Sequence, residues 1–588
     1  MRTRTRLAGL AAATLAAVPL LAAPAGAAPT APATPRASAE VDAATAWLAS
    51  QQEADGGFEL ADFPGFETPD AVLALAAAGQ PGPGWDEAAA LAAVEAVTTD
   101  GNDALDAVDD WVDSVQGGDA ATASAQAGKV IALVAAPLGL DPTDFDPSDD
   151  TAEPVDLVAA LEAGAGGAGD FAGLPFGGRV FAAWAYGARG QLAPPALLSS
   201  IVASQQANGS FDFSGDPGGT GTDPDLTASV VIALTLADDA SGPDTAPAVA
   251  RAVLSLGLTQ EWTGEWATAF DDGNPNSTSM VVLAAATLGG DPDAPCWRDA
   301  VDPRIAGLPY PSPTATLEAR QQPDGHIAGP NDGFGLNTFA TTQAVQALVA
   351  ADGSWPYAGA GCTAPTVGAN RRLVNAIYAD LLGRLTDASG SAFWAGQLDS
   401  GALTPAQYAR RLTGTGEYNR RVVDRLVAQY GLDGLEQPVL DGDERAILAA
   451  AVRDGRRYDA AAYLLGTQEY YDSTAPAFPA GPPTAESWVD AVYPVVVGRP
   501  ADAAGRQWAL GQLASGRSRQ QVARTLLGST EALRVLVTDT YHQLLRRDTD
   551  VAGRDFWVGE IRRGQSPERL VLLIAGSSEY VRKTGPAA

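Results

Sequence analysis

The sequence predicts an all-α protein made of two different sets of helical repeats. In residues 40–352, an amphipathic helical segment, a glycine turn and an almost wholly apolar helical segment follow one another repeatedly. In residues 371–585, a second pattern places Tyr, Leu and Phe or Trp at helical spacing. The net charge of −34 is uneven, because nearly all the excess acid lies in residues 40–370. We therefore expect two helical regions joined by a linker at residues 353–370.

The N-terminus carries the features of an export signal. Three arginines within residues 2–6 precede an apolar stretch, and the Ala-Gly-Ala at 25–27 supplies the small residues of a cleavage site. The apolar stretch falls short of the ~20 residues that span a bilayer. We expect a signal peptide at 1–27, a disordered lead-in at 28–39, and a secreted chain without a membrane span. Association with a cell surface stays open.

Four clear copies of the first repeat are present. Each begins with apolar residues at helical spacing, stops at a turn glycine, and continues with an aromatic residue or Ile. A second, nearly all-apolar helix follows each turn. The residues expected to cap these second helices are Thr68, Thr227, Ser277 and Thr341. With two weaker copies near residues 111–116 and 157–161, about six hairpins would close into an α/α toroid at residues 40–352.

The first repeat resembles a known motif. Gln260, Gly264 and Trp266 match the glutamine–tryptophan repeat of squalene and terpene cyclases and of protein prenyltransferase β subunits. The other copies match in part and are aligned on Gln52, Gln206 and Gln322. The resemblance covers about residues 41–350 and implies the toroid fold, but a shared fold does not carry a shared chemistry with it.

The same resemblance implies one candidate catalytic site. Class II cyclases protonate an alkene or epoxide with a carboxylic acid in an Asp-x-Asp-Asp-Thr-Ala run, and burial must keep that acid protonated. The run at 223–228 is Asp-Pro-Asp-Leu-Thr-Ala, which puts Asp225 on the proton donor's position and Leu226 in place of the last Asp. The alternative is that Asp223 and Asp225 only cap a helix starting at Thr227. The expected inner helices, mostly Ala, Val and Thr, offer few of the aromatic residues that line a cyclase cavity.

No metal or cofactor site is expected. A prenyltransferase-type zinc site needs Asp, Cys and His ligands, and the chain has only His326 and His542, with two cysteines that lack ligand spacing. In an oxidising compartment Cys296 and Cys362 are expected to pair as a disulfide. The residues around Cys362 do not match the thioester of complement-type toroids. Cobalamin-carrying toroids and sugar-cleaving (α/α)₆ enzymes with paired carboxylates stay open as comparisons.

The second half follows a motif of its own. The pattern Tyr-x-x-Leu-Leu-Gly-Arg-x-x-Asp-x-x-Gly-x-x-x-Trp starts at Tyr378 and Tyr541, with a variant at Tyr493, and each copy ends in Gly-x-x-Glu. We expect Tyr, Leu and Trp to be core and the Asp to cap the next helix. The motif resembles a bacterial domain of unknown function similar to phycobilisome linker domains. The resemblance implies helical modules at 371–475 (one clear and one degenerate copy) and 484–585 (two copies), with an assembly or attachment role.

These features favour a secreted, non-enzymatic protein. The toroid would bind a small molecule, or a cell-envelope or protein partner, and the C-terminal modules would provide attachment. The acidic first region argues against nucleic acid, because phosphate contacts need a basic surface. The alternative is a class II terpenoid-cyclase-like enzyme in which Asp225, beside Asp223, donates the proton.

Overall fold

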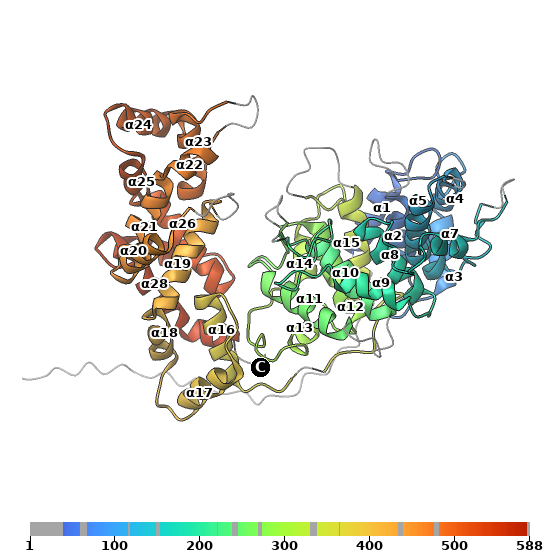
Figure 1. Ribbon diagram of the computed structural model, residues 1–588, viewed down its shortest axis with the longest axis horizontal. Coiled ribbons are helices and arrows are strands. Elements are labelled where there is room, and N and C mark those ends of the chain that lie inside the picture. The colour runs from blue at the N-terminus through green and yellow to red at the C-terminus, as the bar shows by residue number, and fades with distance from the viewer. Residues whose placement is uncertain are drawn as a thin grey trace, which may run out of the picture. The chain divides into compact units, whose positions relative to one another are not determined.

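The computed structural model of the chain is all-α (Figure 1). It describes residues 39–58, 67–115, 118–148, 153–219, 221–237, 245–268, 273–329, 338–363, 365–432, 439–475 and 481–584. No strand occurs among these residues, which confirms the fold class expected from the helical periodicity. The expected signal peptide and the lead-in up to residue 38 lie outside the described residues.

The N-terminal region contains an inner and an outer set of helices. The inner set is α2 (Thr68–Ala78), α5 (Ala120–Val130) with its continuations η1 (Ile131–Ala135) and α6 (Ala136–Leu138), α8 (Phe176–Ala188), α10 (Pro224–Ala237), α12 (Pro275–Thr287) and α15 (Thr338–Ala351). The outer set is α1 (Ala39–Ala49), α3 (Glu87–Glu95), α4 (Ala104–Ser114), α7 (Leu157–Ala163), α9 (Pro195–Val202), α11 (Thr245–Thr259), α13 (Cys296–Asp299) and α14 (Pro313–Ala319). Every residue of α12 is buried, as expected for a helix enclosed by neighbours.

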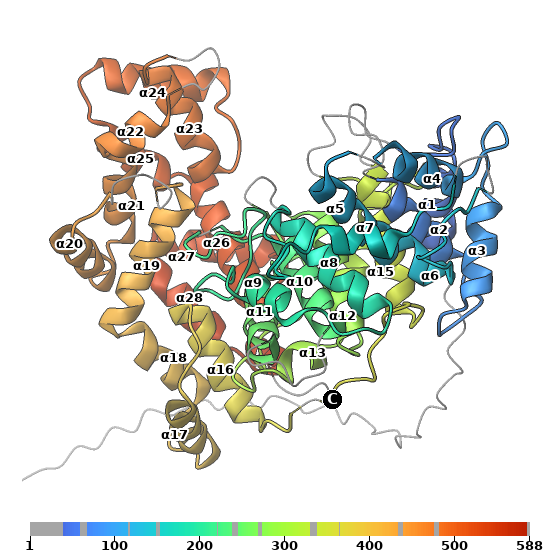
Figure 2. The ribbon, with the colours of Figure 1, turned by 45° about the vertical axis from the view of Figure 1, so that its right-hand side comes forward.

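The inner helices pack in a closed order. Helix α2 packs against α15, α15 against α12, α12 against α10, α10 against α8, and α8 against α5. The π-helical η1 continues α5 and returns to α2, which completes a ring. Helices α10, α12 and α15 lie side by side in Figures 1 and 2. Among the described residues, the run Ala120–Leu138 is long and apolar enough to cross a membrane, and its burial in the ring accounts for that composition.

Each clear repeat makes the same glutamine contact. A Gln Nε2 donates both to the carbonyl of the turn glycine four residues later and to a backbone carbonyl of the next outer segment. The acceptors are Gly56 and Val97 for Gln52, Gly209 and Ala248 for Gln205, Gly264 and Pro311 for Gln260, and Gly325 and Glu40 for Gln321. The expected alignment on Gln206 and Gln322 is therefore wrong by one residue. Two glutamines are adjacent in these copies, and only the one with four-residue spacing reaches the glycine carbonyl.

A buried threonine hydroxyl in four of the inner helices, α2, α10, α12 and α15, holds the preceding turn in place. The backbone N–H two residues after the turn glycine donates to a threonine Oγ1. The pairs are Phe58 and Thr68, Phe211 and Thr227, Trp266 and Thr278, and Ile327 and Thr341. The expected N-cap role of Thr68, Thr227, Ser277 and Thr341 is wrong, because the helices begin at or before these residues and the Thr hydroxyls are used by the turns.

Residues 353–363, which we call the strap, cross the interior of the ring. The indole N–H of Trp355 donates to Thr287 Oγ1 at the end of α12, at 2.9 Å. The Tyr357 hydroxyl donates to the Ala132 carbonyl in η1, on the opposite side of the ring. Both aromatic side chains are buried, and Tyr357 meets the ring of Trp184 edge-on at 5.7 Å. The first part of the expected linker is therefore packed into the ring.

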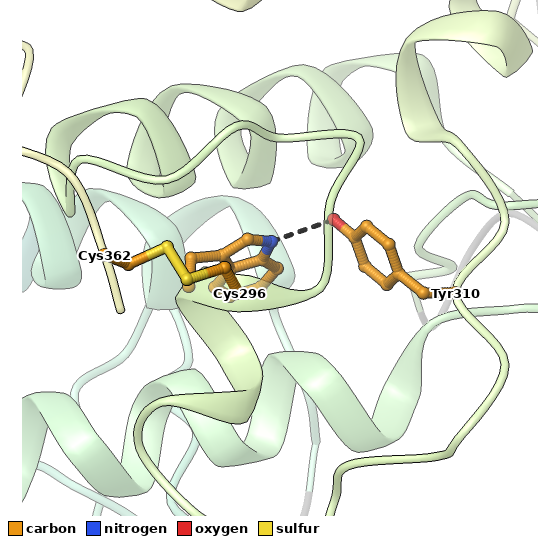
Figure 3. The surroundings of a disulfide bond; sticks show 4 residues. Cys296, Tyr310 and Cys362 are labelled. Carbon is orange, nitrogen blue, oxygen red and sulfur yellow. Dashed lines mark hydrogen bonds between the residues drawn. A yellow bond between two sulfur atoms is a disulfide. The ribbon is translucent and has the colours of Figure 1, made fainter. Parts of the chain in front are cut away.

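The expected disulfide between Cys296 and Cys362 is present (Figure 3). It ties the end of the strap to α13 and closes a loop with a sequence separation of 66. Beside it, the Trp297 indole N–H donates to the Tyr310 hydroxyl at 3.0 Å, the dashed contact in Figure 3. Both cysteines of the chain are used in this bond.

The C-terminal region is a second helical assembly with its own core. Its helices are α16 (Ala369–Leu382), α17 (Ala388–Asp399), α18 (Pro405–Thr413), α19 (Gly416–Gln429), α20 (Gly442–Arg453), α21 (Arg457–Gly466), α22 (Gln468–Ser473), α23 (Ala485–Val497), α24 (Ala503–Ala514), α25 (Arg519–Leu527), α26 (Thr530–Leu545), α27 (Val551–Arg562), α28 (Pro567–Ala575) and α29 (Ser578–Thr584). One hydrophobic cluster runs from Leu373 to Tyr580. Helices α17 and α24 lie at opposite ends of this region in Figures 1 and 2.

The C-terminal motif is held by repeated contacts. The Arg of each Gly-Arg, which is replaced by Arg-Arg in the last copy, pairs through its guanidinium with the Glu of the closing Gly-x-x-Glu. The pairs are Arg384 and Glu417, Arg499 and Glu531, and Arg547 and Glu579. The motif Asp accepts the N–H of the glycine three residues later, at 2.7 Å in all three copies (Asp387, Asp502 and Asp550). The expected N-cap role of this Asp is confirmed.

Candidate functional site

A cavity opens inside the ring of inner helices. Its volume is about 240 Å³. The polar lining residues are Asp70, Lys129, Asp223, Asp225, Ser229, Gln343 and Gln346. The apolar lining residues are Leu133, Gly177, Phe181, Trp184, Phe213, Leu226, Met280, Leu283 and Phe339. A concave, mostly apolar space with a few convergent polar groups is the usual form of a small-molecule site.

The repeat places many of these side chains at equivalent positions. In each inner helix with a turn-binding Thr, the residue two positions after that Thr lines the cavity. These residues are Asp70, Ser229, Met280 and Gln343. Asp225 and Phe339 stand two positions before the corresponding Thr and line the cavity as well. The same inner-helix register therefore builds most of the cavity wall.

Asp225 is the central polar group of this wall. It is the second residue of α10, and its buried Oδ1 accepts no hydrogen bond within normal distance among the described residues, although the Ser277 hydroxyl, itself without such a bond, lies near the carboxyl. Burial raises the pKa of the Asp225 carboxyl to about 7, with the nearby Ser277 hydroxyl lowering it and the charge of Asp223 raising it. Near neutral pH this carboxyl can therefore hold or release a proton.

Asp223 and Asp225 have different roles. Helix α10 begins at Pro224, and the Asp223 carboxylate accepts the N–H of Leu226 at 3.1 Å, as a capping side chain does. Burial also raises the pKa of Asp223, and the hydrogen bond from Leu226 offsets part of this rise. Both residues line the cavity, but only Asp223 caps the helix, and the Asp225 carboxyl makes no capping bond. The helix that was expected to start at Thr227 starts three residues earlier, and this changes which side chain faces inward.

Lys129 and Asp70 form an ion pair on the cavity wall. Lys129 Nζ lies 2.8 Å from Asp70 Oδ2, and both side chains are about nine-tenths buried. The ammonium also lies 5.9 Å from the centroid of the Phe181 ring. Lys129 is the last residue but one of α5, which continues into η1, and π-helical turns inside α-helices occur often at functional sites. Sequence reasoning missed this residue, although Lys129 and Lys583 are the only lysines of the chain.

One wall of the cavity is aromatic. Phe181 and Trp184, one turn apart on α8, have stacked rings with centroids 5.7 Å apart. Phe213 follows the turn that leads into α10 and is 78% exposed, so its ring stands at the edge of the cavity. Sequence reasoning underestimated this wall, because Phe181 and Trp184 come from a copy without the glycine turn and Phe213 comes from a connecting segment.

The two histidines do not join this site. His326 Nδ1 lies 2.6 Å from Asp324 Oδ1, and His542 Nε2 lies 2.7 Å from Asp548 Oδ1. Neither lines the cavity. Within the described part of the chain, His, Cys, Asp and Glu form no group of three or more that could hold a metal ion.

A second cavity, of about 350 Å³, lies within the C-terminal region. Its charged lining residues include Arg425, Arg457 and Asp539. Arg425 already donates to the backbone carbonyls of Asp380 and Leu381. The cavity in the ring is the stronger candidate, because there a buried carboxyl oxygen lacks a partner.

Comparison with known families identifies part of the chain. Residues 366–421 and 479–536 match the family described as Domain of unknown function (DUF4214). Both segments lie in the C-terminal region, and they cover the motif copies that begin at Tyr378 and Tyr493. Two segments of the chain are therefore similar to this domain. No curated protein matches the chain in sequence.

Proposed function

We propose that the N-terminal ring is an α/α toroid that binds a small molecule, and that the C-terminal modules attach the exported protein to a partner or surface. The observation that carries this proposal is the Asp225 carboxyl, whose buried Oδ1 has no protein partner in the described residues and faces an apolar cavity. A buried polar atom without a partner costs about 1–3 kcal/mol. A ligand that supplies a hydrogen bond would offset that cost.

The size and the lining of the cavity support binding more than catalysis. Its volume of about 240 Å³ is below the ~300–1,000 Å³ of pockets that hold drug-sized ligands. Leu226 lines the cavity where the cyclase motif has a second acidic residue. The Lys129 ammonium is compensated by Asp70. These features describe a small pocket in which the Asp225 carboxyl is available to a ligand.

Export and attachment belong to the same proposal. The basic and apolar N-terminus with its small-residue cleavage site supports secretion, and the use of both cysteines in a disulfide suits an oxidising compartment. The repeated C-terminal modules contribute no cavity lining at the ring, which fits a separate role in attachment.

Native mass spectrometry of the protein purified from its own culture medium tests the binding proposal. We expect a small molecule that is retained in the native spectrum and lost on denaturation. The Gly177→Leu variant should lose this molecule, because Gly177 lines the cavity and a Cβ there has open space to project into it. Gly173→Leu is the matched control, since Gly173 also has open space and does not line the cavity. Equal retention by both variants, or no retained molecule in the wild type, would contradict the proposal.

A second function is favoured by one observation. The Asp225 carboxyl, with a pKa raised by burial to about 7, beside the stacked rings of Phe181 and Trp184, has the character of a proton donor to an alkene. A cyclase-like enzyme would convert a polyprenyl substrate into a cyclic product, and Asp225→Asn would abolish the product while Asp223→Asn, which keeps a capping side chain, would not. Gas chromatography of the reaction extract distinguishes the outcomes, and a linear substrate recovered unchanged from the wild type excludes this function.

A further inference from the structure

The charges of the cavity do not balance. Three carboxyl groups, Asp70, Asp223 and Asp225, line it together with a single cation, Lys129. Lys129 and Asp70 compensate each other at 2.8 Å. Asp223 and Asp225 remain, and no basic side chain lines the cavity opposite them. An occupant that carries a positive charge would complete the cavity electrostatically.

The unpartnered Asp225 oxygen favours a ligand that supplies a hydrogen-bond donor as well as a positive charge. Asp225 Oδ1 is buried and can only accept hydrogen bonds when the carboxyl is ionised. An ammonium with at least one N–H satisfies this oxygen and its charge together, whereas a quaternary ammonium supplies charge without a donor. Charge-assisted N–H···O bonds are roughly twice as strong as neutral ones.

The aromatic part of the cavity wall is suited to the hydrocarbon part of such an amine. The rings of Phe181, Trp184, Phe213 and Phe339 and the thioether of Met280 surround the cavity. Aromatic faces attract organic cations and bury their hydrocarbon parts. The volume of about 240 Å³ corresponds to about eight water molecules at ~30 Å³ each, so the occupant has roughly ten non-hydrogen atoms.

We propose that the ring cavity binds a small primary or secondary amine, with its ammonium on Asp225 and its apolar part against the aromatic wall. This inference rests on the proposed binding function and adds the chemical class of the ligand. Lys129 is part of the cavity wall and is held there by Asp70 and Phe181. Asp223 adds negative potential beside Asp225.

Isothermal titration calorimetry of the full mature chain with three probes of similar size tests the ligand class. The probes are 2-phenylethylamine, its neutral analogue 2-phenylethanol, and the anion 3-phenylpropanoate. We expect the amine to bind at least about tenfold more tightly than the alcohol, and the anion to bind more weakly than both. Asp225→Asn should remove the preference for the amine over the alcohol, because Asn keeps the shape of the side chain and loses its charge.

The pH dependence gives an independent readout. The charged groups near Asp225 are Asp223 on the same helix, Asp212 in the preceding turn, and the compensated pair of Lys129 and Asp70 across the cavity. Since burial raises the pKa of Asp225 to about 7 and an alkylamine stays protonated below pH ~10, amine affinity should rise about tenfold from pH 6 to pH 8. Binding of the alcohol should not follow this profile.

The outcomes separate the ligand class from the proposed function. Equal binding of amine and alcohol, unaffected by Asp225→Asn, would overturn the amine inference and leave a small-molecule cavity. Preferred binding of 3-phenylpropanoate would overturn it in favour of recognition by Lys129. Absence of binding by every probe, together with no retained molecule in native mass spectrometry, would overturn the binding function itself.

Discussion

The Tyr580 hydroxyl donates a hydrogen bond to Asp380 Oδ2 at 2.6 Å and thereby joins residues that are 200 positions apart. Tyr580 lies on α29, the last helix of the C-terminal region, and Asp380 lies on α16, the first. Arg546 Nη2 reaches the other oxygen of the carboxylate at 3.3 Å. Burial raises the pKa of Asp380, and the charge of Arg546 and the bond from Tyr580 lower it. The modules are thus closed into one unit by a buried polar contact between their two ends.

Replacing Tyr580 tests the strength of this closure. We expect Tyr580→Phe to destabilise the C-terminal region by about 1–3 kcal/mol, because a buried carboxylate oxygen then lacks its donor. Tyr408→Phe is the matched control, since Tyr408 is equally buried and its hydroxyl has no hydrogen-bond partner among the described residues. The Tyr408 variant should change stability by less than about 0.5 kcal/mol. Urea unfolding, with hydrogen exchange of α16 and α29, measures both, and equal effects would contradict the assignment.

The register of the glutamine repeat is directly testable. Gln321 Nε2 donates to the carbonyls of Gly325 and Glu40, whereas the adjacent Gln322 donates only to Arg320 at an exposed position. We expect Gln321→Ala to cost about 1–3 kcal/mol, because two carbonyls lose their donor, and Gln322→Ala to cost less than about 0.5 kcal/mol. Thermal unfolding and hydrogen exchange near Glu40 report the difference. A larger effect at Gln322 would restore the alignment expected from the sequence.

The stability of the ring should depend on the titration of Asp225. Its folded-state pKa of about 7 lies above the ~3.9 of an unfolded Asp, so the folded state binds this proton more tightly. The contribution of Asp225 to stability is therefore full below pH ~4 and is lost as the pH rises from ~4 to ~7. Asp225→Asn cannot ionise, and relative to the wild type it should gain stability over this range, by up to about 4 kcal/mol at ~1.4 kcal/mol per pKa unit.

Unfolding midpoints of the wild type and Asp225→Asn at pH 4, 6 and 8 measure this effect. Asp141→Asn serves as a control of opposite sign, because hydrogen bonds from Thr143 lower the pKa of the exposed Asp141 carboxyl. A constant difference between the wild type and Asp225→Asn across these pH values would show that Asp225 does not titrate in this range.

Removal of the disulfide should loosen the strap. Replacing Cys296 and Cys362 together by Ser frees a loop with a sequence separation of 66, and chain entropy alone predicts a loss of about 4 kcal/mol. We expect a lower unfolding midpoint for the ring and faster hydrogen exchange at Trp355 and Tyr357. Reductant should shift the wild type toward the variant and leave the variant itself unchanged. An unchanged midpoint after reduction would mean that packing of the strap suffices.

The fold was predictable because each repeat needs particular residue types at particular positions. The turn glycines at 56, 209, 264 and 325 all have positive φ, and at Gly325 a Cβ would also collide with the Ala43 carbonyl. Such positions tolerate few residues, so they stand out in a single sequence. The choice between Gln321 and Gln322 was not predictable, because both are polar, adjacent and compatible with the end of a helix, and only the acceptors in space distinguish them.

The candidate site was predictable only in part. The sequence places Asp225 at a possible catalytic or capping position, and the start of α10 at Pro224 decides that its carboxyl lies on the cavity wall. Lys129 and Phe181 come from inner helices without a recognisable turn, so nothing in the sequence aligns them with Asp225. The pairing of Arg547 with Glu579 was equally hidden, because it joins the two ends of a repeated motif, 32 residues apart.

The strap has a topological consequence for whatever enters the ring. Trp355 and Tyr357 join opposite walls at the end of the inner helices, whereas Asp225 lies at the start of α10. Among the described residues, the strap therefore obstructs this end of the ring, and a polymer would have to displace Trp355 or Tyr357 to pass through it. A ligand of the proposed kind would then enter and leave at the end where Asp225 lies, past the exposed ring of Phe213. The rate at which it leaves should therefore depend on Phe213, and short molecules should reach Asp225 more readily than long ones.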